Sequence, residues 1–497
     1  MNDLRPNVVL VLADDLGWGD LSCYGATRIT TPSIDWLASE GLRFTDTHAT
    51  SAVCTPSRYG LLTGRYCWRS PLKSRVLMGH APALIEPGRP TLGSVFGAAG
   101  YRTAAIGKWH LGLGWRQSDG STWSAFREGD PLALEDVGID FERGQDRGRD
   151  LGDSIDYAAP FVGGPTELGF DRFFGIAGSL DMPPYAFLGQ NRTVGIPREE
   201  KREYLTEQRA GYQTDDWDES QVDLNFTREA VQFIREAAAG GEPFLLYFAP
   251  SAPHRPQVPP PFLEGSSQAG PRGDSVVFVD WMVGQIIDEL GRLGVLDDTI
   301  VIFTSDNGAP TIFDDGDTVV HRPNGPWRGQ KGDIWDGGHR EPFVVRWPGH
   351  VPAGIDREDQ FGLVDLLPTL AAMVGIPLPE GAAPDGRDVS AALLGGPALS
   401  ERPLVHHSMG GAFALRMGRW KAIFSSGSGQ GFSDPQGRLL DTTFTHGQLY
   451  DTIADPAEQD NLWDQRPEIV AELYELLKGV VGTPENGLEF ALPLGES

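Results

Sequence analysis

The chain has 497 residues, of which 40% are hydrophobic and 22% are charged, and it contains no long uninterrupted apolar stretch. This composition is typical of an ordinary globular protein and excludes a disordered or membrane-spanning chain. Acidic residues outnumber basic ones by 69 to 41, and the net charge of −28 makes nucleic acid and anionic membrane surfaces unfavourable partners.

Five apolar runs predict the strands of a buried sheet. They are nearly continuous in Val, Ile, Leu and Phe, which is the pattern of strands covered on both faces. The runs lie at residues 8–13, 103–106, 243–248, 299–303 and 342–345. Between them, the stretches at 227–239 and 274–293 carry apolar residues at helical spacing. We therefore expect an α/β fold with a large, mostly parallel sheet sandwiched by helices.

The last quarter of the chain differs in pattern. A Pro-, Gly- and Ala-rich stretch at 375–397 follows a helix-like segment and marks a boundary. Beyond it we expect a small α+β module, with strands at 404–407, 412–417 and 420–424 and a helix at 467–477. This predicts two domains, residues 1–395 and residues 396–497.

Polar side chains follow four of the predicted strands. Each alone has an ordinary interpretation, because Asp and Asn often cap helices or turns and a lone His or Lys is usually solvated. Together they favour one site, since ligands of α/β sheets bind outside the carboxyl ends of the strands. These residues are Asp14, Asp15, Lys108, His110, His254, Asp306 and Asn307.

Asp14, Asp15, Asp306 and Asn307 offer only oxygen ligands, a set that suits a hard cation such as Ca²⁺ or Mg²⁺. Zinc is disfavoured because its sites usually include His or Cys. A net acidic chain that binds an anion needs a local cationic pocket, which Arg58, Lys108 and Lys331 would complete. His110 and His254 can move protons near neutral pH.

Cys54 stands just before a Pro that is expected to start a helix. A thiol near the positive end of a helix is acidified and anions bind there, whereas the alternative is a buried, inert cysteine. The segment continues as CTPSRYGLLTG, which resembles the sulfatase signature, in which this cysteine is oxidised to formylglycine.

The resemblance extends along the chain. Similar elements of the family occur at residues 7–25, 107–112, 252–254, 304–308, 331–342, 415–421 and 448–462. The chain thus resembles the formylglycine-dependent type I sulfatases, arylsulfatase-like members of the alkaline phosphatase superfamily, and this implies an alkaline phosphatase-like fold. Two residues depart from the family's pattern: Asp336 replaces a usual Glu, and Glu341 stands where an apolar residue is common.

The resemblance also implies a metal and a nucleophile. Asp14, Asp15, Asp306 and Asn307 would bind one Ca²⁺, with Mg²⁺ as the alternative, joined by an oxygen of the modified Cys54. As hydrated formylglycine, residue 54 would attack sulfur with one hydroxyl of a geminal diol and form a covalent sulfate.

The remaining residues would assist that reaction. Lys108 and Lys331 would neutralise charge on the sulfuryl oxygens, and Arg58 would orient residue 54. His254 would protonate the departing alcohol, and His110 would take a proton from the second hydroxyl to expel sulfate.

The sequence therefore predicts a sulfuric ester hydrolase that acts on a small-molecule or saccharide sulfate and is matured by a formylglycine-generating enzyme. One alternative is a phosphate or phosphonate ester hydrolase, because sulfur and phosphorus esters have similar tetrahedral shapes. Another is a silent sulfate-binding protein whose Cys54 is never oxidised. The sequence leaves open whether the substrate is an aryl or a carbohydrate ester, and it does not indicate the oligomeric state.

Three further expectations concern the rest of the chain. The irregular segments 117–156 and 183–217 are surface loops or a wall of the substrate site, and candidates for that wall are Tyr185, Trp217, His321 and Trp327. Cys23 and Cys67 are expected to be small buried residues. The apolar run near the start is too short for a signal peptide, so we expect a cytoplasmic protein.

Overall fold

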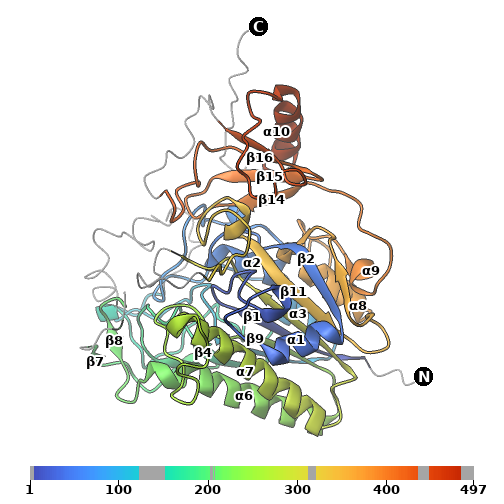
Figure 1. The fold of residues 1–497 in the computed structure, drawn as a ribbon. Coiled ribbons are helices and arrows are strands. Elements are labelled where there is room, and N and C mark those ends of the chain that lie inside the picture. The colour runs from blue at the N-terminus through green and yellow to red at the C-terminus, as the bar shows by residue number, and fades with distance from the viewer. Residues whose placement is uncertain are drawn as a thin grey trace.

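The computed structural model describes residues 5–122, 152–201, 205, 208–311, 321–434 and 447–482, drawn in colour in Figure 1. Much of the irregular segment 117–156 lies outside the described residues. Within the described part of the chain, none of the helices has the length and apolar character needed to span a bilayer.

An 11-stranded sheet forms the centre of the molecule. The predicted strands form within it as β1 (Asn7–Ala13), β3 (Arg102–Lys108), β9 (Phe244–Ala249), β10 (Thr299–Ser305) and β11 (Arg340–Arg346). Four of them are parallel, in the order β10, β1, β9 and β3. β11 instead pairs antiparallel with β10, so the sheet is mostly but not wholly parallel.

The sequence analysis missed the outer strands of this sheet, because these strands are short or mix polar residues with apolar ones. β2 (Leu42–His48) reads LRFTDTH and has half-buried positions, unlike the continuous apolar runs. The others are β4 (Arg172–Ile176), β5 (Phe187–Gly189), β6 (Arg192–Val194), β12 (Ile355–Arg357) and β13 (Phe361–Gly362). A separate two-stranded ribbon consists of β7 (Glu199–Glu200) and β8 (Tyr212–Gln213).

Helices cover both faces of the sheet, as predicted (Figure 1). Alternate residues of β1 enter opposite hydrophobic cores, because successive side chains of a strand point to opposite faces. One core is closed by α1 (Pro32–Ser39), α6 (Glu219–Gly240) and α7 (Gly270–Arg292). The other is closed by α2 (Cys54–Thr63), α3 (Leu92–Ala98), α8 (Leu366–Met373) and α9 (Ser390–Leu393).

Within the residues that the structure describes, four single-turn 3₁₀ helices lie around these two layers. They are η1 (Ser22–Tyr24), η2 (Cys67–Arg69), η3 (Asp336–Gly338) and η4 (Leu363–Asp365).

The C-terminal part forms the predicted small α+β module. Its antiparallel sheet contains β14 (Leu404–His407), β15 (Phe413–Met417), β16 (Trp420–Ile423) and β17 (Gln448–Asp451), the last of which was not predicted. α10 (Pro467–Val481) packs its apolar side chains on one face of this sheet. The domain boundary between residues 395 and 396 stays a prediction.

Backbone hydrogen bonds connect the C-terminal module to two segments of the main body. The N–H of Ala52 donates to the carbonyl of His407 at 2.9 Å, and the N–H of Met409 donates to the carbonyl of Gly332 at 2.9 Å. Gly332 in turn donates to the carbonyl of Ala52 at 2.8 Å. Three segments distant in sequence, around residues 52, 332 and 408, are thereby held together.

Candidate active site

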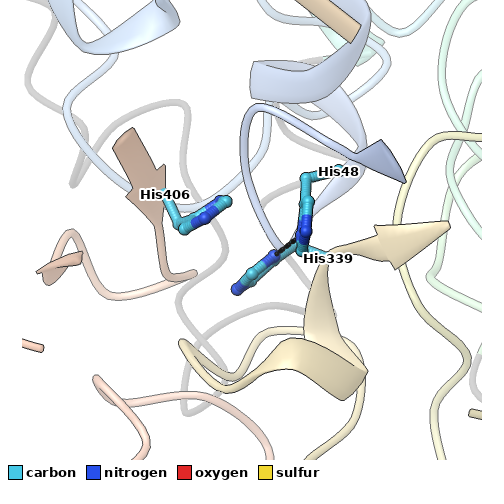
Figure 2. Close-up of side chains that lie close together, drawn as sticks. All are labelled: His48, His339 and His406. Atoms are coloured by element: carbon cyan, nitrogen blue, oxygen red, sulfur yellow. Dashed lines mark hydrogen bonds between the residues drawn. The ribbon is translucent and has the colours of Figure 1, made fainter. Parts of the chain in front are cut away.

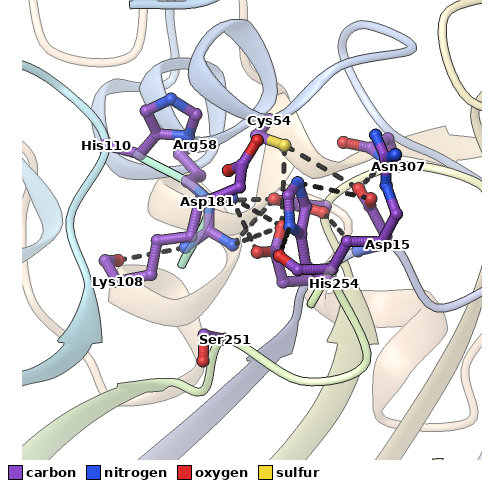
Figure 3. A network of polar contacts seen from close by, with 12 residues as sticks. Asp15, Cys54, Arg58, Lys108, His110, Asp181, Ser251, His254 and Asn307 are labelled. Atoms are coloured by element: carbon purple, nitrogen blue, oxygen red, sulfur yellow. Dashed lines mark hydrogen bonds and ion pairs between the residues drawn. The ribbon is translucent and has the colours of Figure 1, made fainter. Parts of the chain in front are cut away.

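The carboxyl ends of neighbouring strands bring the predicted site residues together (Figure 3). β1 lies between β9 and β10, and Ala13 pairs with Ser305, so the residues that follow these two strands are adjacent. Asp14 and Asp15 follow β1, Asp306 and Asn307 follow β10, and Lys108 ends β3. All five side chains are buried.

Cys54 is the first residue of α2, and Pro56 occupies the first turn, where its missing N–H costs no helical hydrogen bond. The Sγ atom lies 3.5 Å from Asp14 Oδ1 and 3.8 Å from Asp15 Oδ1. The expectation of an acidified thiol is wrong. Burial raises the pKa of Cys54 well above its ordinary value, and Lys108 and Lys331 only partly offset that effect. The unmodified thiol is therefore protonated and a weak nucleophile.

Two lysines hold the aspartates that follow β1. Lys108 Nζ lies 2.7 Å from both carboxylate oxygens of Asp14, and Lys331 Nζ lies 2.6 Å from Asp15. Burial raises the pKa of each aspartate, but the surrounding positive charges outweigh this effect and lower it overall. These charges are Lys108, His254 and Arg58 for Asp14, and Lys331 and His254 for Asp15. Both carboxylates are therefore ionised.

Arg58 holds the third carboxylate of the site. Its Nε donates to Asp306 Oδ2 at 2.8 Å, and its Nη1 donates to the carbonyl of Lys108 at 3.1 Å. Burial raises the pKa of Asp306, and the neighbouring Asp14 carboxylate raises it further. Arg58 lowers the pKa but offsets these effects only in part, so the pKa is about 6. A bound cation would favour the ionised form of Asp306.

The oxygens at this edge of the sheet fit a hard divalent cation. Asp14, Asp15, Cys54 and Asp306 each offer a ligand atom, and these atoms all lie within 4.8 Å of one another. Asn307 donates through Nδ2 to Asp15 Oδ1 at 2.8 Å, which leaves its own Oδ1 buried and without a hydrogen-bond partner. A buried carbonyl oxygen of this kind needs a partner, and Ca²⁺ or Mg²⁺ would provide one.

Two histidines approach the site with one ring nitrogen each. His110 binds the carbonyl of Leu77 through Nε2 at 2.7 Å, and its Nδ1 is buried with no partner. Burial lowers the pKa of His110 well below its usual value, so the ring is a neutral base. His254 binds the carbonyl of Arg255 through Nδ1 at 2.7 Å, and its Nε2 lies 3.6 Å from Asp15.

The sequence analysis missed Asp181, which lies beyond β4 and among the site residues in Figure 3. One carboxylate oxygen forms an ion pair with Arg209, whereas the other is buried without a partner. Burial raises the pKa of Asp181, but Arg209 and then His254 lower it to about 2. The sequence pattern did not indicate Asp181, because β4 was not predicted and because Asp181 stands five residues after the end of β4.

The four candidates for a substrate wall form local contacts instead of meeting at the site. Tyr185 is buried and its hydroxyl donates to the carbonyls of Asp181 and Arg209, while Trp217 packs on its ring. His321 Nε2 lies 2.8 Å from Asp20, and Trp327 packs against Trp18 and the Arg340 guanidinium.

The two remaining cysteines differ from each other. Cys67 is buried, as predicted. Cys23 is only half-buried, so the expectation of burial is wrong for it. The reason is its place in η1, at the margin of the core, where its N–H donates to Asp35 at 2.9 Å.

A second buried cluster with metal-binding residue types lies between the two sheets (Figure 2). We call His48, His339 and His406 the junction histidines. His48 Nε2 bonds to Asp46 at 2.8 Å, His339 Nε2 bonds to the carbonyl of Ile334 at 3.1 Å, and the two Nδ1 atoms are 3.0 Å apart. The rings of His339 and His406 stack with centroids 4.0 Å apart. Burial lowers the pKa of all three.

Buried ion pairs adjoin the junction histidines. Lys421 Nζ lies 2.7 Å from Asp336 Oδ1 and 2.8 Å from Glu458 Oε1, and Arg340 Nη1 lies 3.1 Å from Asp336. Asp336, one of the two departures from the family pattern, therefore serves the junction between the sheets and not the metal shell. Glu341, the other departure, is buried without a hydrogen-bond partner, and burial raises its pKa well above the usual value, so it is neutral.

Buried carboxylates that could hold a cation, bordered by Lys and Arg at the carboxyl edge of an α/β sheet, suit a hydrolase for the ester of a tetrahedral oxyanion. The comparisons with known proteins agree with this class. A family model described as Sulfatase matches residues 6–376. The chain belongs to the sulfatase family, whose members are sulfuric ester hydrolases, and it is an enzyme of that type.

Relatives support this assignment over nearly the whole chain. The chain is 34% identical to an N-acetylgalactosamine-6-O-sulfatase of Bacteroides thetaiotaomicron, covering 96% of this chain and 94% of the relative. It is 34% identical to human arylsulfatase A, covering 97% and 85%. A solved structure from work on glycosaminoglycan metabolism by Bacteroides thetaiotaomicron has a TM-score of 0.79 at 32% identity, covering 96% of this chain and 99% of that one.

Proposed function

We propose that this sulfatase cleaves its ester with a formylglycine derived from Cys54 and with one bound Ca²⁺. The observation that carries the proposal is the buried thiol at the start of α2, whose Sγ lies 3.5 Å from Asp14 and 3.8 Å from Asp15. Oxidation and hydration of this side chain would place hydroxyl groups beside the carboxylates. Residue 54 would then supply the oxygen that attacks sulfur.

Asp14, Asp15, Asp306 and Asn307, together with residue 54, would hold the cation. When bound, Ca²⁺ would lower the pKa of the neighbouring hydroxyl and balance the charge of the sulfate group. Mg²⁺ is the alternative ion, since it also takes oxygen ligands. The orphaned Oδ1 of Asn307 supports this ligand set.

Three cationic side chains would bind the sulfate group. Lys108 and Lys331 are held at the edge of the site by ion pairs of 2.6 to 2.7 Å with the two aspartates after β1. Arg58 is fixed by Asp306 and points its guanidinium toward Asp14 at 3.4 Å. These charges would stabilise the sulfuryl oxygens as negative charge develops on them.

The two histidines would move the protons. His254 keeps its Nδ1 on the carbonyl of Arg255, so Nε2 is the atom that faces the site and would protonate the leaving alcohol. His110 is neutral and keeps an unpartnered Nδ1, so it would accept a proton from residue 54 when sulfate departs.

The test compares kcat/KM for matched 4-nitrophenyl sulfate, phosphate and phosphonate esters. The enzyme is co-expressed with a formylglycine-generating enzyme, supplied with Ca²⁺, and its Cys54 peptide is analysed by mass spectrometry. We expect conversion of Cys54 and a clear preference for sulfate. A preference for phosphorus would favour a phosphate or phosphonate ester hydrolase on the same scaffold. Complete inactivity with an unconverted Cys54 would favour a silent sulfate-binding protein.

The relatives direct the choice of natural substrates to test. One is named for a sulfated amino sugar and another for aryl sulfates. We propose a small-molecule or saccharide sulfate ester as the substrate of this chain, and maturation by a formylglycine-generating enzyme.

A further inference from the structure

We propose that Asp181, supported by Arg209, binds hydroxyl groups of the substrate next to the sulfate and makes the site selective for sulfated sugars. This inference rests on the proposed function, because it concerns what binds beside the nucleophile. It names a residue and a substrate class that the sequence analysis left open.

The position of Asp181 in the fold places it beside the proposed active site. β4 runs parallel to β3, with Ile176 opposite Lys108, so the segment after β4 leaves the sheet beside that lysine. The N–H of His110 donates to the carbonyl of Ala177 at 3.1 Å, which holds this segment against the catalytic residues. Figure 3 shows Asp181 close to Cys54 and His254 in this view.

The neighbour of Asp181 confirms that proximity. Met182 is buried and packs with Val53 and Val76, and Val53 is the residue before Cys54. The segment that carries Asp181 therefore contacts the start of α2, where the nucleophile stands. The electrostatic interaction of Asp181 with His254, whose Nε2 lies 3.6 Å from Asp15, connects it to the same site.

The carboxylate of Asp181 is held from one side and unpartnered on the other. Oδ2 pairs with the Arg209 guanidinium, the N–H of Arg209 donates to the carbonyl of Asp181 at 3.0 Å, and the hydroxyl of Tyr185 donates to that carbonyl at 3.1 Å. Oδ1 is buried with no hydrogen-bond partner. Buried polar atoms are almost always satisfied, so an orphaned acceptor that is rigidly held points to a donor from a ligand.

The chemistry of the surroundings selects the ligand class. An ionised carboxylate only accepts hydrogen bonds, so it would bind hydroxyl groups and repel a second anion. Met78 and Met409 pack as half-exposed side chains on Val53, Val76 and Met182, and together they form an apolar surface beside Cys54. A pyranose ring presents an apolar C–H face and hydroxyl donors at its edge, whereas an unsubstituted aryl ring has no donor for Asp181.

The test compares two substrates across variants of the full-length, matured enzyme with Ca²⁺. The substrates are N-acetylgalactosamine 6-sulfate and 4-nitrophenyl sulfate, with other monosaccharide sulfates as a panel. Loss of a charge-assisted hydrogen bond predicts that Asp181→Ala lowers kcat/KM roughly 10- to 100-fold on the sugar sulfate that the wild type prefers. The value for 4-nitrophenyl sulfate should fall by a clearly smaller factor, because Asp181 then acts only through its charge near His254. Asp215→Ala, an exposed acidic residue of the same region, serves as the matched control and should change neither value.

A second pair of measurements separates binding from a structural role. Arg209→Gln, which removes the support of Asp181, should shift the same ratio in the same direction by a smaller factor. A deoxy sugar sulfate that lacks the bound hydroxyl should be poor for the wild type, and Asp181→Ala should not weaken it further. Equal losses on both substrates, or no loss on the sugar, would overturn the inference.

The design keeps two failures apart. If the matured wild type cleaves no sulfate ester, the proposed function fails. If it cleaves 4-nitrophenyl sulfate but none of the sugar sulfates, the proposed function stands and the role of Asp181 is wrong.

Discussion

The active site and the junction histidines are both buried clusters of metal-binding residue types, but they differ in which atoms are available. At the active site, carboxylate oxygens of Asp14, Asp15 and Asp306 and the sulfur of Cys54 lie within 4.8 Å of one another, and Asn307 keeps an unpartnered Oδ1. At the junction, His48 and His339 already bond to each other and to Asp46 and Ile334, and of the three junction histidines only His406 has ring nitrogens that lack a hydrogen-bond partner. The density of ligand-type residues alone is therefore a poor guide to metal binding.

Ring geometry and charge strengthen the contrast. The planes of His339 and His406 are nearly parallel, at 13°, and nitrogen lone pairs lie in the ring plane, so these two rings cannot both point to one ion as they stand. Arg416 Nη1 lies 3.2 Å from His48 Nε2, and Lys421 Nζ lies 3.3 Å from His339 Nε2. The positive charges of Arg416 and Lys421 would repel a metal ion bound by these rings. We therefore infer that the junction stabilises the contact between the two sheets.

The largest expected effect is at the nucleophile. Cys54→Ala should lower kcat/KM on 4-nitrophenyl sulfate by at least about 10⁴-fold, because the proposed nucleophile is lost and no neighbouring side chain supplies the attacking oxygen. Cys67→Ala, at the other buried cysteine, is the matched control and should keep its activity. Steady-state kinetics and thermal unfolding of both variants check this. A Cys54→Ala enzyme with more than a hundredth of wild-type activity would contradict it.

Removal of the metal should come next in size. Treatment with EGTA should lower activity by about 10³-fold, since the cation supplies several kcal/mol of charge stabilisation. Added Ca²⁺ should restore the activity. If EGTA, and EDTA, which also removes Mg²⁺, both leave activity and thermal stability unchanged, the oxygen cluster is not a metal site, and the comparison with the junction loses its basis.

A junction variant should affect stability and not chemistry. Lys421→Met leaves Glu458 buried without its cation and leaves Asp336 with Arg340 alone, which should cost about 3–5 kcal/mol of unfolding free energy. Lys478→Met removes an exposed ion pair with Glu475 and should cost less than about 1 kcal/mol. Urea unfolding measures both. A Lys421→Met enzyme that is stable but inactive would place the junction in the catalytic machinery.

The smallest effect is the pH dependence of the junction. Burial holds the pKa of His406 well below its usual value, so the unfolded chain binds more protons as the pH falls below about 6.5 and stability falls with it. One such histidine contributes about 2 kcal/mol of lost stability between pH 7 and pH 5. His406→Phe should remove that contribution to the loss of unfolding free energy between pH 7 and pH 5, and urea unfolding at both pH values measures the change. An unchanged slope would mean that His406 is charged when folded.

The sequence predicted the site better than its surroundings. Asp14, Asp306 and Lys108 could be placed because they follow continuous apolar strands, and the carboxyl ends of parallel strands share one edge. β2 and β4 were missed because their patterns mix polar and apolar residues, and Asp181 was missed with them.

The protonation states could not be read from residue types either. The helix start suggested an acidic Cys54 thiol, but burial next to Asp14 and Asp306 dominates its pKa. Glu341 stands in a strand where an apolar residue is common, and its carboxyl is buried, neutral and without a hydrogen-bond partner.

The hydrogen bonds that join the segments around residues 52, 332 and 408 have a consequence for how the enzyme is made. The segments that carry Cys54 and Lys331 are closed by the backbone of residues 407 and 409, so the catalytic centre is complete only after four fifths of the chain has been synthesised. In the finished fold Cys54 is 1% exposed, out of reach of another protein's active site. If Cys54 is oxidised as proposed, we expect the oxidising enzyme to act on the growing or unfolded chain, before the backbone of residues 407 and 409 joins these segments.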